Sequence, residues 1–170
     1  MIFNLKIVKV DSTYCDYLRK FDNKVVYNKN KKELRPFIGI LFRIDDLEYF
    51  APLTSPKPKH KKMKNKLDFF KIKNGELGAV NFNNMIPVDS SNYSLIDLNN
   101  KNVDIEKLKY QKLLKEQLDW LNSNYNQLKN KSSKLYNLYN LGKLPKSIKT
   151  RCCNFKLLEE KCMEYKKHNI

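Results

Sequence analysis

The hydrophobic positions divide the chain into a first half of strand-like runs and a second half with helical spacing. Residues 1–10 are predicted to form a strand, and Arg35–Ile44 is apolar on both faces, as in a buried strand. Leu47–Leu53 is another apolar run, and Asp45 and Asp46 between these two runs predict a turn that pairs them. The first half is therefore expected to form mainly antiparallel sheet.

A hairpin is expected later in the same half. The runs Leu67–Ile72 and Glu76–Phe82 flank Asn74 and Gly75, and an Asn-Gly pair between two apolar runs strongly indicates a hairpin turn. The short segment Met85–Val88 is also expected to be extended.

One helix is expected in the first half, over residues 13–21. Its apolar positions recur at i, i+3, i+4 and i+7 and are Tyr14, Tyr17, Leu18 and Phe21. Asp11 or Ser12 can cap its start. The polar, lysine-rich residues 22–34 are predicted to form a loop.

The second half has the spacing of amphipathic helices. Apolar residues between Asp104 and about Lys129 fit one long helix, and Ser132 or Ser133 is expected to cap a short helix that ends at Gly142. Asn154 is expected to cap a last helix that runs to about Lys166. Its inward residues are Phe155, Leu158, Cys162 and Tyr165. With 170 residues, the pattern predicts one α+β domain, residues 1–170, in which an N-terminal sheet packs with C-terminal helices.

Composition indicates a folded protein with a polyanionic partner. Hydrophobic residues make up 41% of the chain, enough for an ordinary core. The 34 Lys and Arg residues exceed the 18 Asp and Glu residues, which gives a formal net charge of +16. Such an excess favours nucleic acid as a partner, and an anionic membrane surface second. No stable protein partner is indicated.

Several other classes are excluded by the sequence. No run approaches the roughly 18 apolar residues of a spanning helix. The first ten residues carry lysines within their apolar stretch and lack a cleavage site, so they do not form a signal peptide and a cytoplasmic protein is expected. The four cysteines form no Cys-x-x-Cys pair and there are only two histidines, so no zinc set, other metal site or cofactor is predicted.

The basic residues concentrate in two segments. Between Lys57 and Lys73 there are eight lysines against one acid, Asp68. Within this segment, the lysines that we expect to contact a nucleic acid are Lys59, Lys61, Lys62, Lys64 and Lys66. Between Lys129 and Arg151 there are seven basic residues and no acid. From this second segment we expect Lys131, Lys134, Lys146, Lys149 and Arg151 to bind RNA, whereas the simpler alternative is a solvated surface.

The first basic segment begins at a turn rich in hydroxyl groups. Thr54 and Ser55 lie between Pro52 and Pro56, and Lys57 follows. Proline fixes φ and disfavours helix at the preceding residue, so we expect a stiff bend with both hydroxyls at its apex. Hydroxyls and an amine beside a positive field are suited to a phosphodiester, although an exposed solubilising loop has the same composition.

Six segments carry a family resemblance in order along nearly the whole chain. They are Tyr14–Leu18, Pro36–Ile40, Tyr49–Lys57, Gly78–Val88, Leu95–Leu98 and Cys153–Lys161. Together with His60 they resemble the toxins of type III toxin–antitoxin systems, the ToxN/AbiQ endoribonuclease family with CptN-like toxins included. The Ala-Pro-Leu-Thr-Ser-Pro-Lys stretch within Tyr49–Lys57 is the most specific part of the match.

This resemblance implies a compact α+β fold with a twisted antiparallel sheet. It also implies metal-independent, sequence-preferring cleavage of cellular or phage RNA that leaves a 2′,3′-cyclic phosphate. The implied partner is an antitoxin RNA of tandem repeats folding as pseudoknots, which the toxin processes. Toxin and RNA are expected to alternate in a closed assembly in which the RNA blocks the active site.

The resemblance also implies functional positions. The family's tyrosine in the first helix falls on Tyr14, its two hydroxyls on Thr54 and Ser55, and its catalytic lysine on Lys57. A basic residue before the buried strand falls on Arg35, and a loop tyrosine has only Tyr27 as a candidate. For Tyr14, a place in the core is the alternative.

In metal-free RNA cleavage, Lys57 can stabilise charge on a non-bridging phosphate oxygen, and Thr54 and Ser55 can orient the phosphate or the 2′-hydroxyl. His60 can serve in acid–base chemistry or contact RNA, or it can simply be exposed. Tyr93, Tyr136 and Tyr139 can stack on bases, although core packing is favoured for the last two. The competing function is a basic RNA-binding module without catalysis. A DNA-binding regulator is less favoured because no helix-turn-helix or basic zipper is present.

Overall fold

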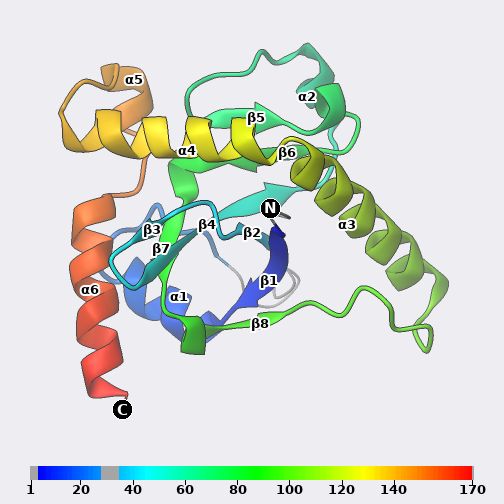
Figure 1. Cartoon of the computed structure of the whole chain (residues 1–170), viewed down its shortest axis with the longest axis horizontal. Coiled ribbons are helices and arrows are strands. Elements are labelled where there is room, and N and C mark those ends of the chain that lie inside the picture. Colours follow the sequence, from blue (N-terminus) through cyan, green and yellow to red (C-terminus); the bar gives the residue numbers. More distant parts are fainter. Residues whose placement is uncertain (1–3, 28–34, 170) are drawn as a thin grey trace.

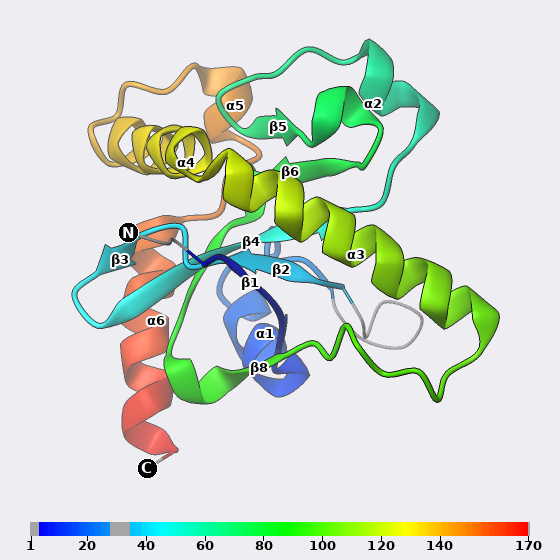
Figure 2. The same ribbon diagram turned by 45° about the vertical axis from the view of Figure 1, so that its right-hand side comes forward.

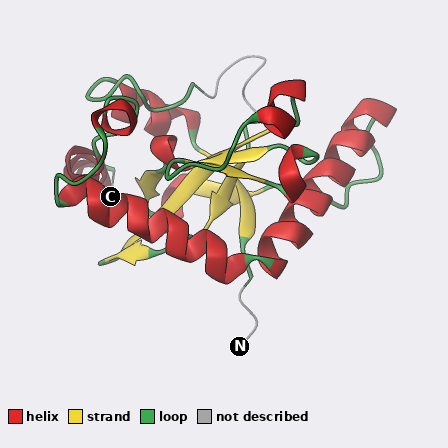
Figure 3. Ribbon diagram, turned by 90° about the horizontal axis from the view of Figure 1, so that it is seen from above, coloured by secondary structure: helices red, strands yellow, loops and turns green. Residues whose placement is uncertain are grey.

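The computed structural model describes residues 4–27 and 35–169. A twisted antiparallel sheet lies in the middle, and helices surround it (Figure 3). The helices of the C-terminal half run over one end of the sheet and down one side (Figure 1). The expected α+β architecture, with a sheet from the first half and helices from the second, is confirmed.

Eight strands pair in the order β5-β6-β4-β2-β1-β8, and β3 and β7 pair with β4 as well. Their bounds are β1 Lys6–Val10, β2 Phe37–Gly39, β3 Arg43–Ile44, β4 Leu47–Thr54, β5 Phe69–Lys71, β6 Ala79–Asn81, β7 Ile86–Val88 and β8 Tyr93–Leu95. Strand β4 is the hub, because β2 and β3 lie along one side of it and β6 and β7 along the other. Every strand pair among the described residues is antiparallel, including pairs of strands that are not consecutive in the chain, such as β1 with β8 and β4 with β7.

The helices and short 3-10 turns connect and cover these strands. The α-helices are α1 Ser12–Arg19, α2 Pro58–Lys62, α3 Ile105–Ser123, α4 Tyr125–Asn140, α5 Lys146–Lys149 and α6 Phe155–His168. The 3-10 turns are η2 Lys73–Gly75, η3 Phe82–Asn84 and η4 Ser90–Asn92. Figures 1 and 2 place β5, β6 and α2 at one end of the molecule, and the C-terminal end of α6 at the other.

Proline in the middle of the sheet is accommodated by a gap between two neighbouring strands. Pro52 lies opposite Phe37 of β2. On the other side of β4, β7 pairs as far as Phe50 and β6 begins to pair at Leu53, with η3 between them. Since the Leu53 N–H points to Pro36 on the β2 side, the nitrogen of Pro52 points toward this gap, where no ladder hydrogen bond is required.

The apolar pattern fills a single core around β4. Its largest fully buried side chains include Phe37, Phe50, Phe70, Phe82 and Phe155, drawn from both halves of the chain. The last helix packs as expected, with Phe155, Leu158 and Cys162 buried and the Asn154 side chain accepting the Leu157 N–H. Burial of this apolar area is the main stabilising contribution to the fold.

Two predicted helices have different bounds in the structure. The long helix expected to reach about Lys129 ends at Ser123, and α4 then runs through Ser132 to Asn140 without the expected new start. Asn124 separates the two, with ψ of 24° and its side-chain amide donating to the Trp120 carbonyl at 2.8 Å. An asparagine that bonds the preceding turn competes with helix propagation, which explains the break. The expected end beside Gly142 is confirmed, with φ of 66° there.

The structure also changes the details predicted for three other segments. Arg35–Ile44 is not one strand but two short ones, β2 and β3, with Leu41 hydrogen-bonded to Tyr49 between them. The hairpin at Asn74 and Gly75 is confirmed, but η2 lengthens its loop, so β6 starts only at Ala79. The lysine-rich segment expected to be a loop contains α2, which Pro58 starts at its first position.

Candidate active site

The hydroxyl-rich segment follows the end of the central strand. Thr54 is the last residue of β4, and its backbone pairs with Ala79 of β6. Ser55, Pro56 and Lys57 then leave the sheet as exposed residues. The bend therefore begins after Thr54, and Pro52 lies within the strand rather than at the bend as expected. The strand predicted from the apolar run Leu47–Leu53 is confirmed as β4, and the hydroxyl-rich turn follows its end.

Two close contacts fix the position of Thr54. Gln117 of α3 is 1% exposed, and its amide nitrogen lies 2.6 Å from the Leu77 carbonyl oxygen and 3.4 Å from that of Thr54. Gly78 has φ of 104°, and a Cβ there would lie 2.0 Å from the backbone carbonyl oxygen of Thr54. Only glycine permits this approach of the β6 hairpin, so the end of β4 is held from two directions.

Lys57 is followed by a one-turn helix that holds its backbone. Lys57 is the residue before α2, with an extended conformation, and its carbonyl accepts the His60 N–H at 2.9 Å. In return, the Lys57 N–H donates to Nδ1 of His60 at 3.2 Å. The Lys57 side chain is exposed and has no ion pair among the described residues. Its ammonium group is therefore available to an anion.

His60 is buried, which overturns the alternative of a simply exposed residue. The side chain is 2% exposed and its ring lies 5.8 Å from that of Phe69. Burial, and then the positive charges of Lys57 and Lys59, lower the pKa of His60 from its ordinary 6.5. A neutral imidazole is required for Nδ1 to accept the Lys57 N–H, so the lowered pKa and the hydrogen bond agree.

A pocket of about 380 Å³ lies beside this turn. It is lined by Thr54, Lys57, Lys59, His60, Met63, Lys66, Asp68, Phe69, Asn81, Asn83 and Arg151. Four of these residues are Lys or Arg and one is acidic, so the pocket is suited to an anion. We call this pocket the Lys57 groove.

The one carboxylate of the Lys57 groove is neutralised within the protein. Asp68 is 2% exposed, and its two oxygens accept from Nε and an Nη of Arg151 at 2.5 and 3.0 Å. The other Nη of Arg151 donates to the Ser147 carbonyl. This paired arrangement leaves the lysines as the uncompensated charge of the groove.

The structure gathers part of the predicted RNA-binding set at this groove. Lys57, Lys59, Lys66 and Arg151 line it together with Thr54 and His60. Lys61, Lys62 and Lys64 are exposed nearby in sequence but do not line it. In the second basic segment, Lys134, Lys146 and Lys149 are exposed, whereas Lys131 is half-buried with its ammonium 5.3 Å from the centre of the Phe70 ring.

The structure places Tyr14 in the core, away from the Lys57 groove. The side chain has no exposed surface, and its hydroxyl donates to the Pro87 carbonyl at 2.7 Å. Burial, chiefly, raises the pKa of Tyr14 well above its ordinary value. This burial agrees with the alternative that Tyr14 is a core residue, and its assignment to catalysis stays a prediction.

Two further candidates also lie outside the Lys57 groove. Arg35 is half-buried before β2. Burial raises the pKa of Tyr110 in α3, and the positive charge of the nearby Arg35 lowers it by a smaller amount. Tyr27 is 43% exposed, and the Arg19 guanidinium lies 4.9 Å from its ring centre. Of the tyrosines considered for stacking, Tyr136 is 5% exposed and packs against Phe155, as the core alternative predicted.

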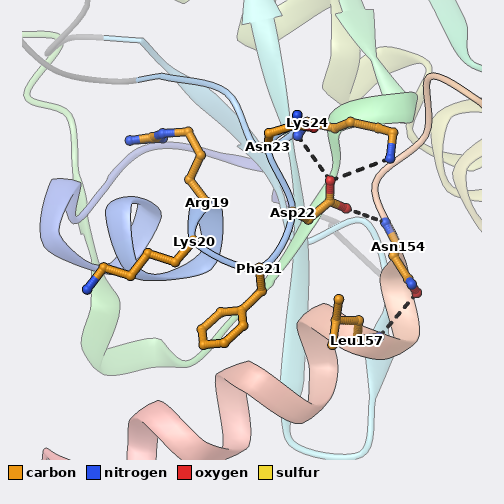
Figure 4. Close-up of a pocket in the computed structure, with 8 residues that line it drawn as sticks. All are labelled: Arg19, Lys20, Phe21, Asp22, Asn23, Lys24, Asn154 and Leu157. Atoms are coloured by element: carbon orange, nitrogen blue, oxygen red, sulfur yellow. Dashed lines mark hydrogen bonds and ion pairs between the residues drawn. The ribbon is translucent and has the colours of Figure 1, made fainter.

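A second pocket, of about 410 Å³, lies between the end of α1 and the start of α6 (Figure 4). Asp22 occupies its centre, and its oxygens accept from the Asn154 N–H at 2.6 Å and the Lys24 N–H at 3.0 Å. Arg19 and Lys20 point away from this carboxylate (Figure 4). Because Asp22 links the segment after α1 to the residue that precedes α6, we interpret this pocket as part of the packing between the two helices.

The sequence reasoning missed the neutral side of the Lys57 groove. Asn81 and Asn83 come from β6 and η3, Met63 follows the last residue of α2, and Phe69 is the first residue of β5. The only available signal was the predicted hairpin, which places Phe69 and Asn81 opposite each other. Nothing in the sequence indicated that α2 would fold back over that pair.

The described residues contain neither a metal-binding cluster nor a membrane-spanning helix. Within residues 4–27 and 35–169, no three His, Cys, Asp or Glu side chains form a group that could hold a metal ion. Over the same residues, no helix is both long enough and apolar enough to cross a membrane. The polar groups that line the Lys57 groove are the amines of three lysines, one guanidinium, the Thr54 hydroxyl, two amides, an imidazole and the paired Asp68 carboxylate.

Comparison with known proteins gives consistent matches over nearly the whole chain. A family model described as toxin ToxN of the type III toxin–antitoxin system matches residues 6–163. The chain is 34% identical over 170 residues to the endoribonuclease ToxN of Bacillus thuringiensis subsp. kurstaki, covering 98% of this chain and 87% of that one. It is 36% identical over 171 residues to the endoribonuclease ToxN of Pectobacterium atrosepticum, covering 96% and 95%.

Solved structures agree in fold as well as in sequence. One is that of AbiQ, described as a lactococcal anti-phage endoribonuclease of the type III toxin–antitoxin system, with a TM-score of 0.80, 30% identity, and coverage of 97% of this chain and 99% of that one. Another is described in terms of selective toxin inhibition by a non-coding RNA pseudoknot, with a TM-score of 0.81, 33% identity, and coverage of 96% and 99%.

Proposed function

The chain belongs to the ToxN family of type III toxin–antitoxin toxins, and from this membership we propose that residues 1–170 act as an endoribonuclease toxin. The observation that carries the proposal is the exposed Lys57 just beyond the end of β4, without an ion pair among the described residues and beside two hydroxyls and a cationic groove. The two ToxN relatives and AbiQ are named endoribonucleases. The substrates proposed are cellular or phage transcripts in the cytoplasm.

The reaction proposed is transesterification within the RNA. The 2′-oxygen of one nucleotide forms a bond to the adjacent phosphorus, and the bond from phosphorus to the 5′-oxygen breaks. The proton of the 2′-hydroxyl is lost and one is gained by the 5′-oxygen, which leaves a 2′,3′-cyclic phosphate and a 5′-hydroxyl. Since atoms and charge balance without a redox step, the protein has only to position the phosphate and stabilise the extra negative charge.

Lys57 is assigned to stabilising the extra negative charge that the phosphate gains during the reaction. An ammonium beside a non-bridging oxygen stabilises the phosphorane more than the ground state, because the phosphorane carries one more negative charge. Ser55 and Thr54 are assigned to hydrogen bonds that orient the phosphate or the 2′-hydroxyl. His60 holds the Lys57 backbone, and its neutral ring leaves Nε2–H as a further donor. Lys59 and Lys66 are assigned to neighbouring phosphates.

The partner proposed is an antitoxin RNA of tandem repeats folding as pseudoknots. A pseudoknot with a single-stranded end can occupy the Lys57 groove and so exclude substrate. We also propose that the toxin processes this RNA and alternates with it in a closed assembly. The related structure described in terms of selective inhibition by a non-coding RNA pseudoknot supports this proposal.

The test compares Lys57→Ala with the unaltered protein on RNA in EDTA. We expect the unaltered protein to produce fragments with cyclic-phosphate ends, and Lys57→Ala to produce none while keeping its thermal midpoint and most of its RNA affinity. Lys167→Ala, at an exposed lysine near the C-terminus, is the matched control and should cleave normally. Intact RNA with the unaltered protein would instead favour the non-catalytic RNA-binding module.

A further inference from the structure

An uncommitted amide faces the same groove as the lysine assigned to catalysis. Asn81 is half-buried at the end of β6, and its side chain makes no hydrogen bond among the residues that the structure describes. Its backbone pairs with Phe69. Ala79, two residues earlier on the same strand, pairs with Thr54, so Asn81 is fixed by the sheet relative to the bend that carries Lys57.

The other amide nitrogen and the carboxylate of the Lys57 groove already have partners within the protein. The Asn83 amide nitrogen donates to the Asn84 side chain at 3.1 Å and to the Arg151 carbonyl at 3.3 Å. Asp68 is paired with Arg151. Asn81 is therefore the groove amide with both its donor and its acceptor available to a ligand.

Apolar side chains accompany this amide. Phe69 lies opposite Asn81 in the strand register and is 8% exposed, and Met63 is half-buried on the same pocket wall. A phosphate only accepts hydrogen bonds and has no apolar face, and the exposed lysines are already assigned to phosphates. A nucleobase has an apolar face together with an edge that carries donors and acceptors, so it matches the combination of Asn81, Phe69 and Met63.

We propose that Asn81 reads the edge of one nucleobase next to the cleaved phosphate and so determines part of the sequence preference. This rests on the proposed ribonuclease function and names a subsite within it. An asparagine amide forms two parallel hydrogen bonds with a base edge that offers a donor beside an acceptor. Because β6 is paired on both sides, the amide is presented without a large loop movement.

The experiment sequences the cut ends from a randomised single-stranded RNA pool. We expect Asn81→Ala to lower the base preference at one position beside the cut by about tenfold, with preferences elsewhere unchanged. Asn81→Asp, which keeps an acceptor but loses the donor, should change which base is preferred at that same position. Asn169→Ala, at the far end of the molecule, is the matched control and should leave the profile unaltered.

Each outcome decides one question. An unchanged profile with Asn81→Ala overturns the inference and leaves the ribonuclease function standing. A uniform loss of cleavage at every site also overturns it, because an amide that holds the backbone would act equally on all sequences. No cleavage by the unaltered protein would contradict the proposed function instead. If Asn81→Ala does not fold, Asn81→Thr, which suits a strand, provides the same comparison.

Discussion

The backbone N–H of Lys57 donates to Nδ1 of His60 at 3.2 Å, so a buried imidazole holds the residue whose ammonium faces the groove. The bond spans three residues and closes the first turn of α2. Protonation of Nδ1 would remove the acceptor and place a positive charge between Lys57 and Lys59. The conformation of the active segment is therefore coupled to the charge of His60.

This coupling predicts an acid-sensitive site. Burial and the nearby lysines lower the pKa of His60 below 6.5, so the folded state binds fewer protons than the unfolded state. The stability contribution is fully present above about 6.5 and is lost as the pH falls from there toward the folded-state pKa. Urea unfolding at stepped pH should show the loss. His60→Asn, whose amide oxygen accepts at any pH, should flatten this dependence, and an unchanged profile would contradict the coupling.

Tyr14→Phe separates a core role from an RNA-contacting role. Removing the hydroxyl leaves the buried Pro87 carbonyl without its partner, so the free energy of unfolding should fall by about 1 kcal/mol. Cleavage per folded molecule should stay within about twofold of the unaltered protein, a change well below 1.4 kcal/mol in barrier height. Denaturant unfolding and initial cleavage rates check the two parts. Lost cleavage with unchanged stability would show that Tyr14 reaches the RNA.

Breaking the ion pair between Arg151 and Asp68 should chiefly lower the stability of the protein. Arg151→Ala leaves the Asp68 carboxylate buried without its partner, so the free energy of unfolding should fall by about 1–3 kcal/mol. Lys149→Ala, at an exposed lysine in the same segment, should change it by less than about 0.5 kcal/mol. Adding Asp68→Asn to Arg151→Ala should recover part of the loss. Additive effects in this double-mutant cycle would show that the pair is not coupled.

RNA affinity should depend steeply on salt. If about six single-stranded phosphates are neutralised, the logarithm of the affinity should fall against the logarithm of the salt concentration with a slope of about −4. Lys59→Ala should reduce the slope by about 0.7 if that lysine binds one phosphate. Titrations of catalytically inactive Lys57→Ala at several salt concentrations provide the measurement. A slope near zero would contradict an electrostatic interface.

Local patterns predicted most elements of the fold because they depend on neighbouring residues. The turn at Asp45, the hairpin at Gly75 and the cap at Asn154 are all short-range signals, and each is present. The helix break at Asn124 was missed because Leu128 and Leu135 continue the apolar stripe across it. Periodicity records which face is buried, and it does not record an amide that turns back on its own helix.

The site was predicted only in part because its two sides come from distant segments. Thr54, Ser55 and Lys57 lie within four residues of one another in the chain, so their sequence was informative. The opposite side depends on how α2 folds over the β5–β6 hairpin, a long-range contact with no local signature. The same limit applied to His60, whose residue type suggested chemistry but whose burial appears only once Phe69 packs against it.

Ser55 and Lys57 contribute almost nothing to the packed interior, since both are exposed beyond the end of β4. Cells selected for escape from this protein should therefore yield two kinds of mutant. Changes at core positions such as Phe50 would deplete the chain by unfolding, whereas changes at Lys57 would leave it abundant, harmless and still able to occupy its cognate transcript. Such a variant would sequester the RNA without cleaving other transcripts. Any second nuclease that the same RNA inhibits would then become active.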